Sequence, residues 1–498
     1  MSTPPRRSVS AAAREARSGE HALGRAVGDV RLGVRQRIDA VRAVADARWG
    51  RPREESQPIY LIAPAGHPNH GDEQLLAGWL RYLRHRRPGT PVVVDCHTPG
   101  QAAVLHHSEH PDVLFTDTLW RLAGEHGVPA DASAAARVDA ATAAVEFCRR
   151  AVTDLGTRPE LASGIDLLRS ASDIHLIGGG YVNDQWPHHL GVVAAAGEAG
   201  RLGGAHVVAT GQGFVPCANA AGLADALRDF QLVTVRDSAS RDLLAASAVP
   251  VHLVGDDGWL ALAAGAGIGE DDHPVYSRDH DAARELVVCA QSDLVDPEVL
   301  AAALARILAA WKVPGDRLTV VESIPGGDRV VWDLVCARAD AADTAAAEGS
   351  SEGAGLAAGG GKDQESDDDD NNTVDPVGRA LAELDLSRAR FVPFKDLWDT
   401  GLPARSGQAW LTSRFHPHLF AAARGASGLV LGSGSHYYDI KHGSLVAAGS
   451  SWGTVDAAAV ASGSEVPPFP AGGGFTEPAV DALVSAAEAL ADDLYPRT

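Results

Sequence analysis

Short apolar runs alternate with amphipathic stretches along most of this chain. In the first cycle, 59–62 has the pattern of a buried strand, 67–72 of a loop, 73–84 of a helix and 92–94 of the next strand. A strand composed only of apolar residues is typical of a parallel sheet that is covered on both faces. The pattern therefore predicts an α/β fold built from βαβ units.

Several later apolar runs end in glycine or in charged residues. They lead into Gly178-Gly179-Gly180, into Gly211-Gln212-Gly213 and into Arg236-Asp237, after which a helix is expected from Ser238 to Ala246. A second series of strands is expected at 285–288, 318–321, 391–392 and 428–431. Open parallel sheets bind ligands at the carboxyl ends of their strands. We predict two Rossmann-like, doubly wound domains that face one another across a cleft.

The same pattern divides the chain into four parts. We expect a helical extension at 1–56, a first domain at 57–265, a second domain at 266–475 and a C-terminal helix at 476–498. A length of 498 residues fits two domains better than one, because single cores stop growing at about 250 to 300 residues.

The first 56 residues carry twelve arginines against seven acidic residues, and their valines and isoleucines recur at intervals of three and four. This is the pattern of an amphipathic helix with a basic outer face. Such a helix can lie on a membrane surface near lipid-linked substrates, or it can pack on the protein itself or on a second copy. The second interpretation is favoured, because bulky membrane-seeking aromatic residues are nearly absent.

Charge is distributed unevenly along the chain. The net charge of −22 argues against nucleic acid as the main partner. Between Asp340 and Asp375 there are eleven acidic residues against the single Lys362, interleaved with alanine, glycine and serine. Such a composition buries little apolar surface, so we predict a disordered acidic insertion at 340–375.

The five cysteines are scattered and form no C-x-x-C pair, which favours reduced thiols in a cytoplasmic protein. No apolar run reaches the roughly 18 residues that span a bilayer, and the N-terminus lacks the apolar core of a signal peptide. No metal-binding motif is present either, so no metal and no cofactor are expected.

The hexapeptide Ser413-Arg414-Phe415-His416-Pro417-His418 follows a short apolar run and precedes a helical pattern. It brings a guanidinium and an imidazole to a helix start, where free backbone N–H groups favour an anion. Two interpretations are open. Arg414 and His416 bind and act on an anionic ligand, or Arg414 pairs with a carboxylate and His416 is a core histidine.

Several ordered motifs resemble those of the polysaccharide pyruvyltransferases, a family whose two Rossmann-like domains are arranged as in GT-B glycosyltransferases. They are Asn69-His70-Gly71-Asp72-Glu73, Ile177-Gly178-Gly179-Gly180, Gly211-Gln212-Gly213 with Pro216, Arg236-Asp237 with Ser240, Asp256, Ser413-Arg414-Phe415-His416 and Lys441. Each piece is weak alone, but their order and spacing make a specific set. The chain departs from the family pattern at Asp256-Asp257-Gly258 and in the longer turn 433–438.

The resemblance implies that pyruvate is transferred from phosphoenolpyruvate to two hydroxyls of one sugar, giving a cyclic ketal in cell-surface or extracellular polysaccharide biosynthesis. The acceptor would be a sugar or glycan, free or lipid-linked. Arginine suits a donor that carries both a carboxylate and a phosphate. The resemblance therefore assigns the donor to Arg236, Arg414, Phe415 and Lys441, and the acid–base steps to His416 and Asp72. The cleft or acceptor side would contain Asn69, Gly71, Glu73, Gly179, Gly180 and Gln212.

Simpler structural roles stand beside these assignments. Asp72 can be a helix N-cap with Glu73 in the first turn. Arg236 can pair with Asp237 or Asp256, and Lys441 can be solvated. The triple glycine can make a tight turn, and it is not the G-x-G-x-x-G of dinucleotide-binding domains.

Tyr181, Trp186, His188 and His189 follow the triple glycine, and their rings suit either a sugar or core packing. Two other classes of function use the same fold. A GT-B glycosyltransferase would need a nucleotide-sugar site, and a noncatalytic sugar-binding relative would lack the donor site.

Overall fold

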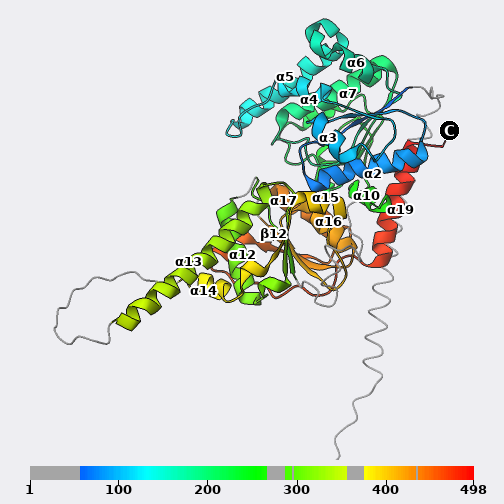
Figure 1. Ribbon diagram of the computed structural model, residues 1–498. Helices are drawn as coiled ribbons and strands as arrows, with labels where there is room; N and C mark the ends of the chain where they lie inside the picture. The colour runs from blue at the N-terminus through cyan, green and yellow to red at the C-terminus, as the bar shows by residue number, and fades with distance from the viewer. Residues whose placement is uncertain (1–56, 266–285, 294–295, 356–374, 433–435, 498) are drawn as a thin grey trace, which may run out of the picture.

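The computed structural model describes residues 57–265, 286–293, 296–355, 375–432 and 436–497. Two α/β bodies lie against one another, and each is built on one parallel sheet (Figure 1). The predicted basic helix at 1–56 and the acidic segment 356–374 lie outside the described residues.

The first sheet has seven strands in the order β3-β2-β1-β4-β5-β6-β7, and every neighbouring pair is parallel. Its strands are β1 (Ile59–Ile62), β2 (Val92–Asp95), β3 (Val113–Thr116), β4 (Asp173–Leu176), β5 (His206–Gln212), β6 (Leu232–Val235) and β7 (Val251–Leu253). The order reverses between β1 and β4, which makes their carboxyl ends the switch point of this sheet.

The second sheet has six parallel strands in the order β10-β9-β8-β11-β12-β13. Its strands are β8 (Leu286–Cys289), β9 (Leu318–Val321), β10 (Arg390–Val392), β11 (Ala409–Thr412), β12 (Ser427–Gly432) and β13 (Gly453–Asp456). Here the order reverses between β8 and β11. The structure confirms the prediction of two doubly wound parallel sheets in a GT-B-like pair of domains.

Helices connect the strands of both sheets. In the first domain they are α2 (His70–Arg86), α3 (Pro99–His106), α4 (Thr118–Gly124), α5 (Ala134–Thr153), α6 (Ala162–Arg169), α7 (Leu190–Gly203), α8 (Ala220–Ala226), α9 (Ser238–Leu243) and α10 (Gly258–Ala263). In the second they are α12 (Pro297–Trp311), α13 (Gly327–Gly355), α14 (Pro376–Ala382), α15 (Phe394–Thr400), α16 (Phe415–Ala423), α17 (His436–Ala447) and α18 (Ala457–Ala461), followed by α19 (Glu477–Leu494).

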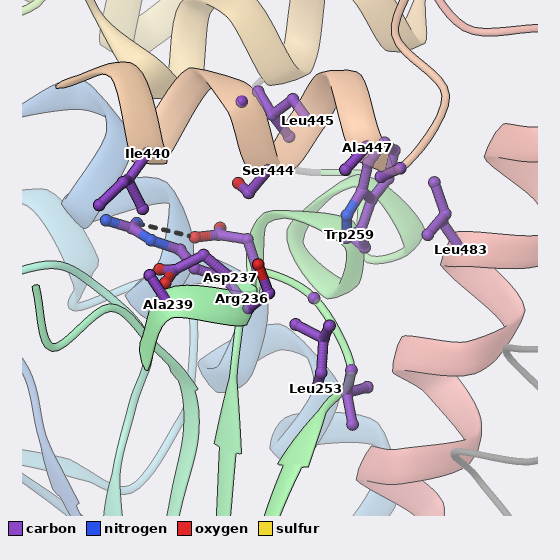
Figure 2. Close-up of a pocket in the computed structure, with 16 residues that line it drawn as sticks. Arg236, Asp237, Ala239, Leu253, Trp259, Ile440, Ser444, Leu445, Ala447 and Leu483 are labelled. Atoms are coloured by element: carbon purple, nitrogen blue, oxygen red, sulfur yellow. Dashed lines mark hydrogen bonds and ion pairs between the residues drawn. The ribbon is translucent and has the colours of Figure 1, made fainter. Parts of the chain in front are cut away.

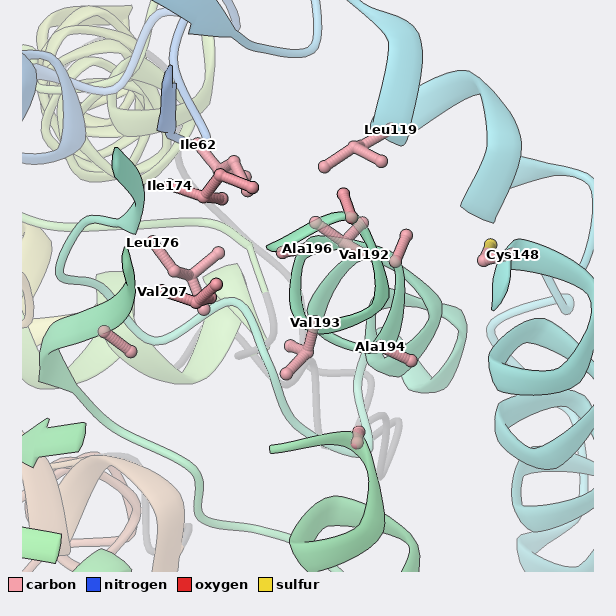
Figure 3. Close-up of a cluster of buried hydrophobic side chains, with 14 of the residues drawn as sticks. Ile62, Leu119, Cys148, Ile174, Leu176, Val192, Val193, Ala194, Ala196 and Val207 are labelled. Atoms are coloured by element: carbon pink, nitrogen blue, oxygen red, sulfur yellow. The ribbon is translucent and has the colours of Figure 1, made fainter. Parts of the chain in front are cut away.

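The core of the first domain is organised around α7, a helix that is buried along nearly its whole length. Figure 3 shows Val192, Val193 and Ala196 of this helix between the strand side chains of Ile174 and Val207 and the helices that cover them. A helix without a polar face must be covered on all sides, and its small residues let neighbours approach closely. This core rigidly holds β4 and β5, whose ends carry glycine turns.

The C-terminal helix α19 returns to the first domain (Figure 1). Leu490 and Leu494 are buried with the side chains of β1 and α2, and the Tyr495 hydroxyl lies 2.9 Å from Nδ1 of His175 in β4. The end of the chain therefore packs on the first sheet although the preceding residues belong to the second.

Two local expectations were wrong. Helix α2 starts at His70 rather than Glu73 and is capped by Asn69, whose side chain accepts from the Gly71 N–H, so Asp72 lies in the first turn instead of acting as the N-cap. The acidic segment was predicted to be disordered from residue 340, but α13 continues to Gly355. Its alanines, which have the highest helix propensity, outweigh the local charge there.

Among the described residues, no helix combines the length and the apolar character needed to cross a membrane.

Candidate active site between the two switch points

A cavity of about 110 Å³ lies where the carboxyl ends of the two sheets face one another. The loops after β1, β4 and β6 contribute its first wall, and the residues after β8 and β11 together with α17 contribute the second. Eight of the twelve predicted site residues line it: Asn69, Asp72, Gly180, Arg236, Arg414, Phe415, His416 and Lys441. Both switch points thus open into one cavity, which is where doubly wound sheets bind ligands.

Arg414 stands at the end of β11 and is the N-cap residue of α16. Its backbone N–H donates to Thr412 Oγ1, which in turn donates to the Cys289 carbonyl of the neighbouring strand. Helix α16 starts without a side-chain cap, so its first amides stay available to an anion.

The Arg414 guanidinium is held by two carboxylates. Its Nε lies 3.1 Å from Oδ1 of the buried Asp328, and its Nη1 lies 3.1 Å from Oδ2 of Asp293. Burial lowers the pKa of Arg414, but the two carboxylates outweigh it and hold that pKa above its usual value. The Asp293 side chain is 47% exposed, so it is the partner that an incoming anion could replace.

Arg236 follows β6 and is equally confined. Its Nη1 lies 3.0 Å from Oδ2 of Asp256, and its guanidinium stacks over the Phe415 ring at 4.5 Å from the ring centre. A Cβ on Gly180 would lie 2.6 Å from Nη2, and one on Gly213 would lie 2.7 Å from Nε. The two glycines are therefore needed so that the backbone can lie against this arginine. The predicted alternative, pairing with Asp256, is present in the structure.

His416 lies in the first turn of α16 and reaches across to the first domain. Its Nε2 is 3.5 Å from Oδ1 of Asp256, and a Cβ on Gly71 would lie 1.9 Å from its Nδ1. The ring also stacks on Phe420 at 6.1 Å. Gly71 does not line the cavity itself, but it allows the imidazole to come close to the start of α2.

The pKa values of the nearby acidic and basic groups are shifted in different directions. Burial raises the pKa of Asp256, but the nearby His416 and the charge of Arg236 bring it down to about 2. Burial also lowers the pKa of Lys441 well below its usual range, and Arg236 adds to this effect. Burial raises the pKa of Asp72, although His416 and Lys441 act in the opposite direction. A lysine that releases its proton easily thus lies in the same cavity as a carboxyl that holds its proton more readily.

Three predicted residues, besides Gly71, do not line the cavity. Glu73 is fully buried and accepts from the Gly66 N–H and from His106. The Gln212 amide donates 2.7 Å to the Ile177 carbonyl, and Gly179 takes a positive φ of 146° in the turn after β4. All three shape the loops that carry the site.

Sequence reasoning missed Gln291, Asp293 and Asp328. Asp293 follows β8, so the rule that ligands bind at strand ends could have found it. Asp328 lies at the start of α13, 86 positions from Arg414, and nothing local marks it as that residue's partner.

Two histidines join the helices that carry His416 and Lys441. The Nδ1 atoms of His418 and His442 lie 3.0 Å apart, and His418 Nε2 lies 2.8 Å from Ser450 Oγ. His442 Nε2 lies 3.3 Å from the Ser413 carbonyl. Burial lowers the pKa of His418 well below its usual value and that of His442 to about 3. Neutral histidines therefore connect α16 to α17.

A second, more apolar cavity of about 290 Å³ lies on the other side of Arg236. Figure 2 shows it between Leu253 and Trp259 of the first domain and Ser444 and Leu445 of α17. The dashed line marks the Arg236 ion pair with Asp256. This pair therefore separates the two cavities.

Within the part of the chain that the structure describes, no group of three or more histidine, cysteine, aspartate or glutamate residues is arranged to hold a metal ion.

The two facing sheets and the cavity between them, lined by two arginines and a lysine, define a two-domain α/β protein with a candidate anion site at the junction of its domains. A family model described as polysaccharide pyruvyl transferase matches residues 69–309, so nearly half of the chain is similar to this family. The matched range includes the loop at Asn69, the triple glycine and Arg236, while Arg414 and His416 lie beyond it. A search of curated sequences found no match.

Among solved structures, the chain is similar to a UDP-glucose:anthocyanidin 3-O-glucosyltransferase in complex with UDP, with 12% identity, a TM-score of 0.45 and coverage of 88% of this chain and 94% of that one. It is also similar to a UDP-GlcNAc 2-epimerase from Neisseria meningitidis, with 9% identity, a TM-score of 0.42 and coverage of 82% and 90%.

Proposed function

We propose that this protein is a polysaccharide pyruvyltransferase that transfers pyruvate from phosphoenolpyruvate to two hydroxyls of one sugar and forms a cyclic ketal. The observation that carries the proposal is the convergence of Arg236, Arg414 and His416 on one cavity. These residues come from both domains and are separated by up to 180 positions in the sequence. The match of residues 69–309 to the family model supports the same assignment.

The donor has two anionic groups on its central carbon, a carboxylate and a phosphate. Arg236 and Arg414 offer planar guanidinium groups from opposite walls, and each can bind an anion through two parallel N–H bonds. The uncapped start of α16 adds backbone N–H groups on the Arg414 side. In this scheme the donor replaces the exposed Asp293 at Arg414, while the buried Asp328 stays and keeps the guanidinium oriented.

The reaction needs an acid, a base and a stabilised leaving group. The oxygen of the first sugar hydroxyl adds to the central carbon of phosphoenolpyruvate, and a proton goes to the methylene carbon, which becomes a methyl group. Phosphate then leaves with the electron pair of its C–O bond, and the second hydroxyl adds to the same carbon and loses its proton. The products are the cyclic ketal and inorganic phosphate.

We assign the protonation of the methylene carbon to His416, because imidazole exchanges protons near neutral pH and lies in the cavity wall. The hydroxyl protons would go to Asp72 or to Lys441. Asp72 is a carboxylate with a raised pKa, and Lys441 is an amine with a lowered pKa. Both changes bring the group closer to the pH at which it can accept and release a proton. The two arginines stabilise the departing phosphate.

The acceptor would enter beside aromatic side chains. Tyr181, Trp186 and Tyr438 line the same cavity, and aromatic faces with polar edges suit sugar rings. Holding the diol and the donor together in this way would supply much of the rate acceleration.

Calorimetric titration with phosphoenolpyruvate, and separately with UDP and GDP, tests the proposal. We expect phosphoenolpyruvate to bind to the wild-type protein and to Arg424→Ala, a control at the exposed end of the same helix α16, but not to Arg414→Ala. Binding of a nucleotide without binding of phosphoenolpyruvate would overturn the proposal and favour a glycosyltransferase.

A further inference from the structure

Asp256 lies where polar and charged side chains of the two domains meet. It follows β7 after Gly255, and its Oδ1 accepts 2.8 Å from the Gly258 N–H, which fixes the carboxylate in the loop before α10. Oδ2 receives Arg236 at 3.0 Å, and Oδ1 faces His416 Nε2 at 3.5 Å. Its side chain is 1% exposed. One buried carboxylate thus faces a donor-side arginine of its own domain and the imidazole of the other domain.

We propose that Asp256 is a positioning residue that orients the His416 imidazole and links it to Arg236. This inference rests on the proposed function and extends it, because it assigns a role to a residue that does not line the cavity itself. Asp256 acts through His416 and through Arg236, and not on the substrate.

The geometry determines which ring nitrogen is available. When Nε2–H of His416 faces the Asp256 carboxylate, the other nitrogen, Nδ1, lies against Gly71 in the first turn of α2. The neighbouring Asn69 and Asp72 of that turn line the cavity. Asp256 therefore directs Nδ1 toward the start of α2, beside the residues that line the cavity. The distance of 3.5 Å is longer than a hydrogen bond, as is common in catalytic pairs before the substrate binds.

The charge of the imidazole depends on every titratable group that faces it. From α2 these are His70 and Asp72, and from the first sheet they are Asp256 and its partner Arg236. Burial lowers the pKa of His70 to about 3, so His70 is neutral at neutral pH. Asp72 holds its proton more readily than a free carboxyl. Asp256 is the carboxylate in this group that remains ionised throughout the working range of pH, since its pKa is about 2.

The same arrangement couples the domains. Asp256 belongs to the first domain and His416 to the second, so the imidazole is oriented only when the two domains are together. Arg236 is held by the same carboxylate. Donor binding at Arg236 and proton delivery by His416 are therefore linked through a single side chain.

The test is Asp256→Asn, which keeps the shape and removes the charge. We expect kcat for pyruvyl transfer to fall by about tenfold or more, because a neutral amide holds the Nε2–H of His416 and the Arg236 guanidinium less firmly than a carboxylate does. The matched control is Asp328→Asn, which removes the carboxylate of the other arginine. We expect Asp328→Asn to raise the KM for phosphoenolpyruvate without a comparable fall in kcat.

Two further measurements keep the inference separate from the proposed function. The ¹⁵N chemical shifts of the His416 ring, which report its charge and tautomer without any turnover, should change in Asp256→Asn and not in Asp328→Asn. In a double-mutant cycle, Asp256→Asn should add little to the loss caused by His416→Gln. Unchanged ring shifts or additive losses would overturn the role of Asp256, even if the protein is a pyruvyltransferase. Absence of phosphoenolpyruvate binding in the wild type would instead refute the proposed function alone.

Discussion

Both arginines that we propose to bind the donor have carboxylate partners, and these partners differ in exposure. Asp293 is 47% exposed and shares Arg414 with the buried Asp328. An exposed carboxylate at this place competes with an anionic donor and repels it. We predict that Asp293→Asn lowers the Kd for phosphoenolpyruvate about threefold to tenfold, an effect of about 1 kcal/mol, as expected for a partly exposed ion pair. Calorimetry measures it. Weaker donor binding in this variant would show that Asp293 helps to build the donor site.

Arg414 and His416 are two positions apart in the sequence but should contribute to different steps. We predict that Arg414→Ala abolishes donor binding, because it removes a buried cation and leaves Asp328 without its partner. His416→Ala should leave binding largely intact and remove turnover. Calorimetry and a phosphate-release assay on both variants separate the two roles, and equal loss of binding in both would contradict this division.

Gly180 allows the backbone to lie against two basic side chains, Arg236 and Lys441. A Cβ here would lie 2.6 Å from Arg236 Nη2 and 3.2 Å from Lys441 Nζ. We predict that Gly180→Ala displaces both side chains and lowers kcat/KM more than tenfold, as small displacements of positioning groups do. Gly100→Ala in α3 is the control, because a Cβ there meets nothing within 4 Å, and its activity should equal that of the wild type.

At the scale of elements, the link between α16 and α17 is a pair of buried histidines. Removing one leaves a buried nitrogen of the other unsatisfied, which costs about 1 to 3 kcal/mol. We predict that His442→Ala lowers the free energy of unfolding by at least that amount and also reduces activity, since Lys441 is its neighbour on α17. Urea unfolding monitored by circular dichroism gives the first quantity. Reduced stability with full activity would show that α17 keeps Lys441 in place without this link.

Sequence patterns located the central strands better than the edge strands. The runs at β1 and β9 were predicted at their observed limits, because these strands are buried on both faces and are rich in apolar residues. The edge strands β3, β7 and β13 were not predicted. Apart from the buried Val455 of β13, their residues are half-exposed or exposed, and neither β7 nor β13 is a continuous apolar run.

At the scale of the whole molecule, buried histidines make stability depend on pH. His175 lies between Thr210 and Tyr495 of the C-terminal tail. Burial is the main cause that lowers its pKa to about 3. Its unfolded pKa is about 6.5, so the unfolded state binds the extra proton between these values. The contribution of His175 to stability is complete above pH 6.5 and is lost as the pH falls toward 3.

We predict that His175→Gln makes stability less sensitive to acid. Between pH 6.5 and 4, the slope of unfolding free energy against pH should decrease by about 1.4 kcal/mol per pH unit. Burial raises the pKa of Asp95 to about 7 and that of Asp257 to about 6. These two carboxyl groups stabilise the folded state as the pH falls, which is opposite to the effect of His175, but both are present in the wild type and in the variant. Urea unfolding at several pH values measures the slope. The exposed His107→Gln serves as control, and an equal slope in all three proteins would refute the prediction.

The sequence by itself determined the class of fold, because a strand buried on both faces and an amphipathic helix each have a local pattern of apolar residues. It also placed glycines, arginines and a histidine at strand ends, and parallel topology brings such ends to one edge. Only the tertiary structure decided which charges meet. Asp256 is 20 positions from Arg236, and Asp328 and Asp293 are 86 and 121 positions from Arg414. Such pairs depend on how two separate sheets and their loops pack together, and no local pattern records that packing.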